Sequence, residues 1–346
     1  MTGRKTNRGR VRAGAVVLLL LLALAGALGW GWFALQRFAV APLQVSAAGQ
    51  SIDIGRGASF KEIVRELRRR GFTRAAPFVW RLQAERMHVA GRLHAGEYAL
   101  PPGITPRQLL DDMARGKVLQ HDFTIVDGWT FRQMLDLLRQ APKLKHDTTG
   151  LDEAAIMQRI GAPGERAEGR FLPETYAYVK GDSDLDILRR AHAAMAKTLA
   201  ELWPQRDKDL PLATPYDALI LASVVEKETG RADERAKIAG VFVRRLEKHM
   251  LLQTDPSVIY GMGDSYHGNI RRSDLTTDTP YNTYVRPGLP PTPIALPGRA
   301  AIEAALHPAA GTALYFVARG DGTHVFADTL DQQNRNVACY QLKRCP

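Results

Sequence analysis

The sequence has few of the residues that usually hold metals. Its 346 residues include two cysteines, Cys339 and Cys345, and nine histidines. The cysteines do not form a CxxC pair, no cluster combines cysteine with histidine, and no HExxH motif is present, so we expect no zinc site and no other bound metal. Outside the cytosol the two cysteines could close a short C-terminal loop. The alternative is a pair of free thiols near a frayed end.

Phosphate-binding glycine motifs are also missing. The chain has no GxxxxGK[ST] sequence and no GxGxxG sequence after a predicted strand, so we expect no nucleotide and no other cofactor. The formal net charge is +11, and five of these charges lie in the first twelve residues. No later block interleaves basic with aromatic residues, which argues against nucleic-acid binding. A chain of this length fits two soluble modules plus an anchor.

One long apolar run lies near the N-terminus. Residues 1–12 form a polar, basic tail, and residues 13–36 then carry no charge. A bilayer-spanning helix needs about 20 apolar residues. Trp30 and Trp32 stand near the far end, where aromatic residues meet the membrane surface. We therefore expect a single-pass anchor with a cytoplasmic N-terminus, and an extracytoplasmic chain after Arg37.

The rival for this run is a cleaved signal peptide, for which residues 23–25 (Ala-Leu-Ala) offer a cleavage site. The apolar run continues well beyond that point and is longer than the hydrophobic region of a usual signal peptide. We therefore favour the retained anchor.

A small α+β module is predicted over residues 46–118. Turn residues and apolar periodicity divide it into alternating elements. Strands are expected at 51–54 and 96–100, and helices at 60–67, 76–87 and 105–116. The module could bind a ligand, or it could serve only as packing support for the rest.

A larger α+β domain is predicted over residues 119–346. Its expected strands are 122–126, 314–318 and 324–326, and its expected helices are 130–138, 185–202, 214–229, 232–246, 299–306 and 330–340. The segment 168–176, which contains Glu174, is dense in Gly, Pro and aromatic residues. We interpret it as a fixed loop that lines a groove or buttresses a core.

The helix predicted over residues 214–229 is the centre of this domain. Thr214 can cap it and Pro215 suits its first position. At about 100° per residue, Glu228 shares a stripe with apolar residues such as Val224 and Val225. Glu226 points nearly the opposite way and is expected to be a supporting or solvent-facing charge.

Glu228 is the candidate catalytic acid. A carboxyl held against apolar side chains loses hydration when charged, so its pKa rises. A carboxylic acid that is still protonated near neutral pH can protonate the leaving oxygen when a glycosidic bond breaks. The plainer alternative is a partly buried helix-end glutamate paired with an arginine or lysine.

The segment after residue 252 is predicted to form long loops rich in Pro, Gly and Tyr. Loops of this length in compact domains are usually functional or disordered, and this many apolar and aromatic residues disfavour disorder. Aromatic faces cover sugar rings, while amides and carboxylates meet hydroxyl groups. Gln253, Asp255, Tyr281 and Asn282 are therefore candidates for positioning a sugar substrate. The alternative is a structural lid.

Several of these segments together resemble the MltG/YceG family of membrane-anchored endolytic murein transglycosylases. The resemblance rests on residues 221–229 (LASVVEKET), 252–261 (LQTDPSVIYG), 280–284 (PYNTY) and His307-Pro308 before residues 314–317 (LYFV). It implies a LysM-like small module, a catalytic Glu228 and a location in the bacterial inner membrane. The sequence departs from the family pattern at Gln333, where a His is common, and at Thr292 and Leu296, where Gly and Asn are common.

The resemblance also implies a reaction on peptidoglycan glycan strands. Glu228 would cleave the MurNAc-β-1,4-GlcNAc bond, and the muramyl C6 hydroxyl would close a 1,6-anhydro ring. Such an enzyme would end growing strands beside peptidoglycan synthases. Two alternatives stay open: a muramidase-type hydrolase with Asp255 or Glu174 as second carboxylate, and a non-catalytic glycan-binding scaffold.

Overall fold

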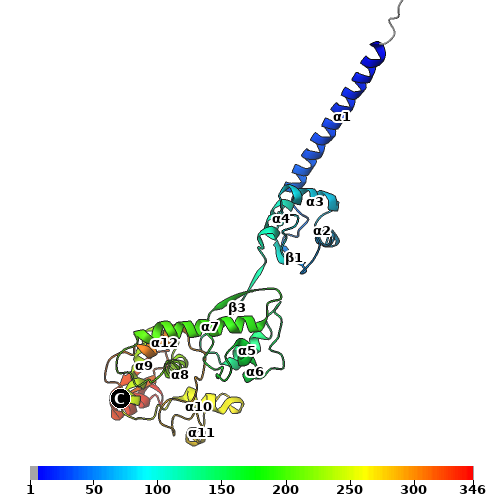
Figure 1. Ribbon diagram of the computed structural model, residues 1–346. Helices are drawn as coiled ribbons and strands as arrows, with labels where there is room; N and C mark the ends of the chain where they lie inside the picture. Colours follow the sequence, from blue (N-terminus) through cyan, green and yellow to red (C-terminus); the bar gives the residue numbers. More distant parts are fainter. Residues whose placement is uncertain (1–6, 346) are drawn as a thin grey trace, which may run out of the picture. The chain divides into compact units, whose positions relative to one another are not determined.

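The chain folds into two compact units, Met1–His121 and Asp122–Pro346 (Figure 1). The computed structural model describes residues 7–345, with side chains from residue 15 onward. Residues 1–6, the first half of the predicted basic tail 1–12, therefore lie outside the described residues. The predicted boundary between residues 118 and 119 lies close to the division between the units.

Unit 1 starts with a long helix and continues as a small mixed module. Its elements are α1 (Asn7–Val40), β1 (Gln50–Ile54), α2 (Phe60–Arg69), α3 (Pro77–Arg86), β2 (Gly96–Leu100) and α4 (Pro106–Arg115). Strands β1 and β2 pair antiparallel, with Gln50 opposite Leu100. Helix α2 begins with a capping box in which Ser59 and Glu62 satisfy each other's backbone N–H groups. Each predicted element of this module is present.

The N-terminal helix joins the module through its last turns. Its segment Ala15–Val40 is long and apolar enough to cross a membrane, by length and composition. Leu35 and Ala39 are buried, and the ring of Phe38 meets the ring of Trp80 edge-on at 5.2 Å. Helix α1 therefore continues into the core of unit 1, beyond the end of the predicted span 13–36.

Unit 2 is larger and mainly helical. The division between the units falls within β3 (Gln120–Thr124). The further elements of unit 2 are α5 (Phe131–Leu138), α6 (Glu153–Ile160), β4 (Thr175–Val179), α7 (Asp184–Leu202), α8 (Pro215–Glu228), α9 (Ala232–Glu247), α10 (Asp255–Met262), α11 (Arg272–Thr276), α12 (Arg299–Leu306), β5 (Tyr315–Ala318), β6 (His324–Ala327) and α13 (Leu330–Tyr340). β3 pairs with β4, and β5 pairs antiparallel with β6. The predicted mixture of helices and sheet is confirmed.

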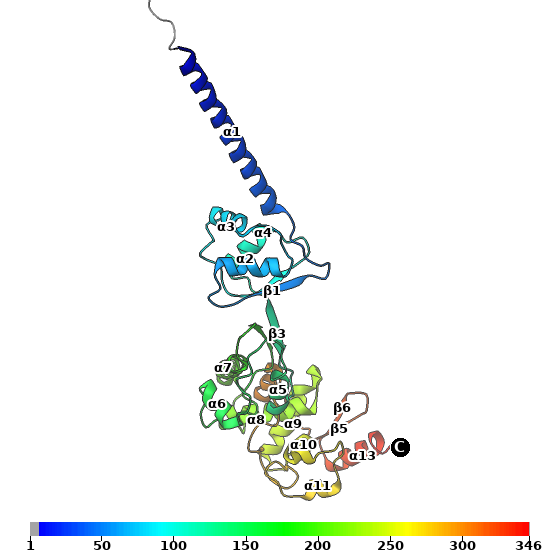
Figure 2. The same ribbon diagram turned by 90° about the vertical axis from the view of Figure 1, so that its right-hand side faces the viewer.

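Helix α8 occupies the centre of unit 2. It packs against α9, α10 and α12, and every side chain from Ala218 to Val225 is buried. The prediction of a single apolar stripe was too narrow, because neighbouring segments cover this part of α8 all round. The hairpin β5–β6 and helix α13 lie beside each other near the C-terminus (Figure 2). Cys339 and Cys345 form a disulfide there.

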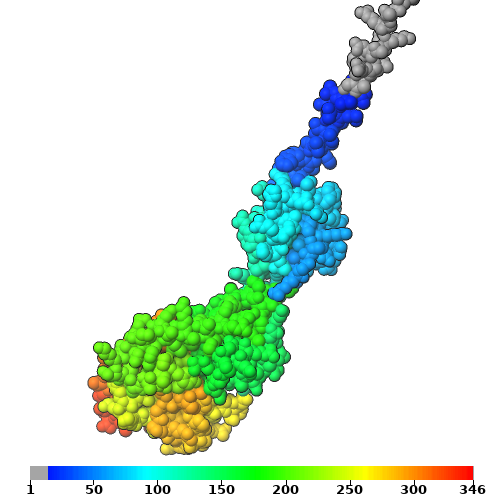
Figure 3. Space-filling view, viewed as in Figure 1, coloured from blue at the N-terminus to red at the C-terminus, as the bar shows by residue number. Residues whose placement is uncertain are grey.

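The sequence patterns do not predict four elements of unit 2: α6, β4, α10 and α11. The alternating exposed and buried residues of β4 are typical of a strand, but the Gly and Pro residues around them favour a loop. Helices α10 and α11 lie in the segment that is predicted to form loops. Pro256 fits the first turn of α10, where a missing N–H costs nothing. In Figure 3 the surface formed around α6 and α7 is green, and the later segments are yellow and orange.

Gly169 permits a close approach between two segments of unit 2. Its φ is +80°, and a Cβ atom there would lie 2.5 Å from Cβ of Pro293. Gly164 has a similar φ of +81°, but a Cβ atom at this position would have no such neighbour within 4 Å. Both positions therefore share the strain of left-handed backbone, and only Gly169 adds a clash.

We expect Gly169→Ala to lower the free energy of unfolding by about 1–3 kcal/mol more than Gly164→Ala does, because overpacking adds to the backbone strain. Urea unfolding of both full-length variants in detergent, followed by tryptophan fluorescence, measures the difference. Equal losses at the two positions would show that the contact with Pro293 does not matter.

Candidate active site around Glu228

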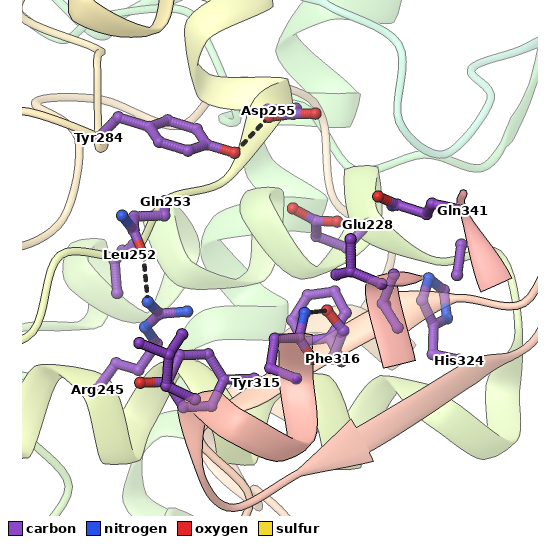
Figure 4. A pocket seen from close by; sticks show the side chains of 15 residues that line it. Glu228, Arg245, Leu252, Gln253, Asp255, Tyr284, Tyr315, Phe316, His324 and Gln341 are labelled. Carbon is purple, nitrogen blue, oxygen red and sulfur yellow. Dashed lines mark hydrogen bonds between the residues drawn. The ribbon is translucent and has the colours of Figure 1, made fainter. Parts of the chain in front are cut away.

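Glu228 is the last residue of α8. A capping box between Thr214 and Asp217 starts the helix, and Thr229 ends it because its backbone is extended. The carboxyl of Glu228 faces a cavity of about 440 Å³. Figure 4 shows the side chains that surround this cavity.

Residues from distant parts of unit 2 line the cavity. Helices α8, α9 and α10, the hairpin β5–β6 and helix α13 all contribute to its lining. The lining residues are Glu228, Arg245, Leu252, Gln253, Asp255, Tyr284, Tyr315, Phe316, Val317, Ala318, His324, Leu330, Gln333, Val337 and Gln341. The lining therefore combines apolar side chains with carboxyl, amide, phenol, imidazole and guanidinium groups.

Burial raises the pKa of Glu228 to about 7. The charge of Asp255 raises the pKa further, whereas a hydrogen bond from Thr254 and the nearby His324 lower it. Desolvation is the largest of these effects, since a charged carboxylate is poorly stabilised away from water. Glu228 can therefore exist as an acid or as a carboxylate near neutral pH.

Thr254 fixes the position of the Glu228 carboxyl. Its Oγ1 donates a hydrogen bond to Oε1 of Glu228, and its N–H donates to Oγ1 of Thr283 at 3.1 Å. Ser257 Oγ lies 2.9 Å from the same Thr283 oxygen. These buried hydroxyl groups form a network that holds one carboxylate oxygen and leaves the other for the cavity.

Asp255 and Tyr284 form a second polar pair in the cavity. The hydroxyl of Tyr284 donates a hydrogen bond to Oδ1 of Asp255 at 2.5 Å. Burial raises the pKa of Tyr284 above its usual value, and the neighbouring Asp255 adds to this rise. Tyr284 therefore remains a hydrogen-bond donor throughout the physiological pH range.

His324 reaches the cavity from strand β6. Its ring nitrogen Nδ1 lies 2.7 Å from Oε2 of Glu234, and its backbone N–H donates to Oε1 of the same glutamate at 3.0 Å. This pair holds β6 against α9. Sequence reasoning missed His324, because a single histidine in a hairpin gives no signal of its own.

Two of the predicted substrate-binding residues, Gln253 and Asp255, lie in the cavity with Glu228. Tyr281 and Asn282 do not line it. The Tyr281 hydroxyl lies 2.9 Å from Oγ1 of Thr292. Asn282 is buried, and its Nδ2 donates to three backbone carbonyls in and directly after α11. Glu174 is exposed beside the pairing of β3 and β4, away from the cavity.

Other lining residues are not predicted by the sequence. Tyr284 belongs to the same PYNTY segment as Tyr281 and Asn282, but only Tyr284 of the three lines the cavity. Gln333 stands out in the sequence only as a departure from the family pattern, and Arg245 and Gln341 give no signal. The hairpin and α13 meet the end of α8 only in the folded chain.

Glu226 is a structural carboxylate and does not face solvent. Its Oε2 accepts a hydrogen bond from the N–H of Gly298 at 3.0 Å, and its Oε1 lies 3.5 Å from Arg235. Burial raises its pKa above the usual range. Of the two roles expected for Glu226, the structure shows the supporting charge; the solvent-facing charge is wrong, because α12 covers this side of α8.

Comparison with known proteins gives a consistent assignment. A model of the YceG-like family matches residues 52–339. The endolytic murein transglycosylase of Bacillus subtilis (strain 168) is 38% identical over 168 residues, which is 49% of this chain and 46% of that protein. The endolytic murein transglycosylase of Streptococcus pneumoniae (serotype 2, strain D39) is 34% identical over 179 residues, covering 50% of this chain and 32% of that protein.

The chain thus spans about half or less of the length of these curated relatives. A crystal structure of a putative YceG-like protein from Listeria monocytogenes matches over 84% of this chain and 99% of that chain. It gives a TM-score of 0.52 at 30% sequence identity. Because the family model covers most of the sequence, from β1 to α13, this chain belongs to the YceG-like family.

Proposed function

We propose that the protein is a lytic transglycosylase that cleaves peptidoglycan glycan strands at internal MurNAc-β-1,4-GlcNAc bonds. The observation that carries this proposal is the Glu228 carboxyl, whose pKa is raised to about 7 and which faces a polar cavity. The two relatives described above are both named endolytic murein transglycosylases, which supports the same reaction class.

One residue can perform both proton transfers of this reaction. Protonated Glu228 donates its proton to the glycosidic oxygen as the bond to the anomeric carbon breaks. The resulting carboxylate then takes the proton of the muramyl C6 hydroxyl, whose oxygen bonds to the anomeric carbon. The product is a 1,6-anhydromuramyl end, and Glu228 returns to its protonated form. The nucleophile belongs to the substrate, so no second catalytic carboxylate is required.

The remainder of the chain suits a role at a membrane. Helix α1 would anchor the protein in the bacterial inner membrane, with a cytoplasmic N-terminus and both units on the outer side. The two strands and three helices of unit 1 after α1 suit a LysM-like module that binds glycan. An anchored enzyme of this kind would act where synthases extend strands, and its cuts would end their elongation.

A hydrolase is the second candidate, and Asp255 is the observation that favours it. This carboxylate lines the same cavity as Glu228 and could activate water. Its Oδ1 already accepts a hydrogen bond from Tyr284, which favours a positioning role instead. A hydrolase would leave reducing muramyl ends, and a non-catalytic scaffold would leave strands uncut.

We expect Glu228→Gln to reduce the rate of strand cleavage about 10²- to 10⁴-fold, because the amide cannot exchange the proton. Mass spectrometry of fragments released from purified strands by the full-length protein measures the rate and identifies 1,6-anhydromuramyl ends. Glu226→Gln is the matched control on the same helix, and it should keep its activity. Reducing ends, or unchanged activity of Glu228→Gln, would refute the proposed mechanism.

The alkaline limb of the pH–rate profile should follow the pKa of Glu228. Thr254→Val removes a hydrogen bond that stabilises the carboxylate, so the pKa rises and the limb moves to higher pH. Asp255→Asn removes a negative charge that disfavours the carboxylate, so the limb moves to lower pH.

Profiles of kcat/KM against pH for the parent and both variants test these two signs. If both variants shift the limb in the same direction, or leave it in place, then another group limits the reaction at high pH. A complete loss of cleavage in Asp255→Asn would instead favour the hydrolase.

A further inference from the structure

An arginine lies in the cavity at a distance from the acid. Arg245 stands in the last turn of α9, lines the cavity and is only 7% exposed. Figure 4 shows Arg245 and Gln253 together on one side of the cavity, with Glu228 and His324 on the other. The proposed mechanism does not use Arg245.

The guanidinium group of Arg245 is largely unpartnered. It carries five N–H donors, and its Nη2 donates to Oε1 of Gln253 at 2.6 Å. Its Nε is buried without a hydrogen-bond partner. Among residues 15–345, no carboxylate lies within 4.0 Å of it. A buried cation without a counter-ion is costly, and the C-terminus of α9 and the ring of Tyr315, at 5.2 Å, offset only part of that cost.

Gln253 supplies further hydrogen-bond donors beside Arg245. Because arginine has only donors, the contact turns the Gln253 oxygen toward Arg245 and leaves its two Nε2 hydrogens for the cavity. The backbone of Gln253 has a φ of +54°, which is rare for a residue other than glycine. Its N–H donates to the carbonyl of Thr283 at 3.1 Å, and this contact helps to hold the strained conformation. Such strain is commonly found at binding sites.

We infer that Arg245 and Gln253 form a carboxylate-binding subsite, which holds an acidic substituent of the glycan strand while Glu228 acts on the glycosidic bond. The inference rests on the proposed function for the identity of the polymer. A guanidinium fork matches the two oxygens of a carboxylate, and the amide hydrogens of Gln253 add further donors.

Two substituents of a muramyl residue carry this chemistry. The lactyl group ends in a free carboxylate where the peptide stem has been removed. Where the stem is present, the lactyl group is an amide, and carboxylates occur along the peptide. Both sources are negatively charged at neutral pH, so the same subsite chemistry would bind either one.

The test measures binding, so it does not depend on cleavage. Full-length Glu228→Gln protein in detergent is titrated by calorimetry with three ligands: stem-free strands, stem-free strands whose lactyl carboxylates are methyl esters, and stem-bearing strands. When Arg245→Gln is combined with Glu228→Gln, binding of a carboxylate-bearing ligand should weaken about 10- to 100-fold, and binding of the methyl-ester strands should not change. Arg319→Gln is the control, since Arg319 also stacks on a tyrosine but lies outside the cavity.

The ligand that shows the loss identifies the source of the carboxylate. Loss with stem-free strands assigns the subsite to the lactyl group, and loss confined to stem-bearing strands assigns it to the peptide. Equal weakening for all three ligands, or no weakening, would overturn the subsite and leave Arg245 with a structural role.

A second variant protects the test against misfolding. Arg245→Lys keeps the positive charge but loses the planar fork, so binding of the carboxylate ligand should fall less than in Arg245→Gln. Thermal unfolding of each variant shows whether it has folded. Cleavage by the parent chain is assayed separately, so a parent that cuts no strand would refute the proposed function without deciding the subsite.

Discussion

The site depends most on the burial of one carboxyl at the end of α8, a helix whose side chains from Ala218 to Val225 are all buried. Helices α9, α10 and α12 pack around the middle of α8, and Glu228 ends this helix at a cavity, where burial disfavours the charged carboxylate. A carboxyl on an exposed helix would be ionised at neutral pH. Here desolvation outweighs the hydrogen bond from Thr254, and the pKa rises to about 7.

The two glutamates of α8 show how position decides role. Glu226 and Glu228 are two residues apart, and burial raises the pKa of both. Glu226 meets the backbone of Gly298 and the cation Arg235, so it joins α8 to α12 and α9. Glu228 meets a hydroxyl network on one side and a cavity on the other. A raised pKa alone therefore does not mark the acid; access to the cavity does.

Local patterns in the sequence predict most of the elements. Caps such as Thr214, and the turn residues 320–322 between the strands expected at 314–318 and 324–326, depend on neighbours along the chain, and these elements are present. The lining of the cavity is harder to predict, because Arg245, His324 and Gln341 come to the same cavity as Glu228 only through packing of distant segments. Asn282 shows the opposite difficulty: an amide suited to sugars instead donates to backbone carbonyls in and directly after α11. Residue types indicate the chemistry that is available, but the fold decides which groups become partners.

The proposed mechanism requires that Glu228 be half protonated near neutral pH. The most direct measurement is a ¹³C NMR titration of its side-chain carboxyl in the full-length protein, with the signal assigned by its loss in Glu228→Gln. We predict a midpoint at about pH 7. A midpoint near the ordinary value of 4.5 would show that the carboxyl is hydrated and ionised, and would contradict its role as the acid.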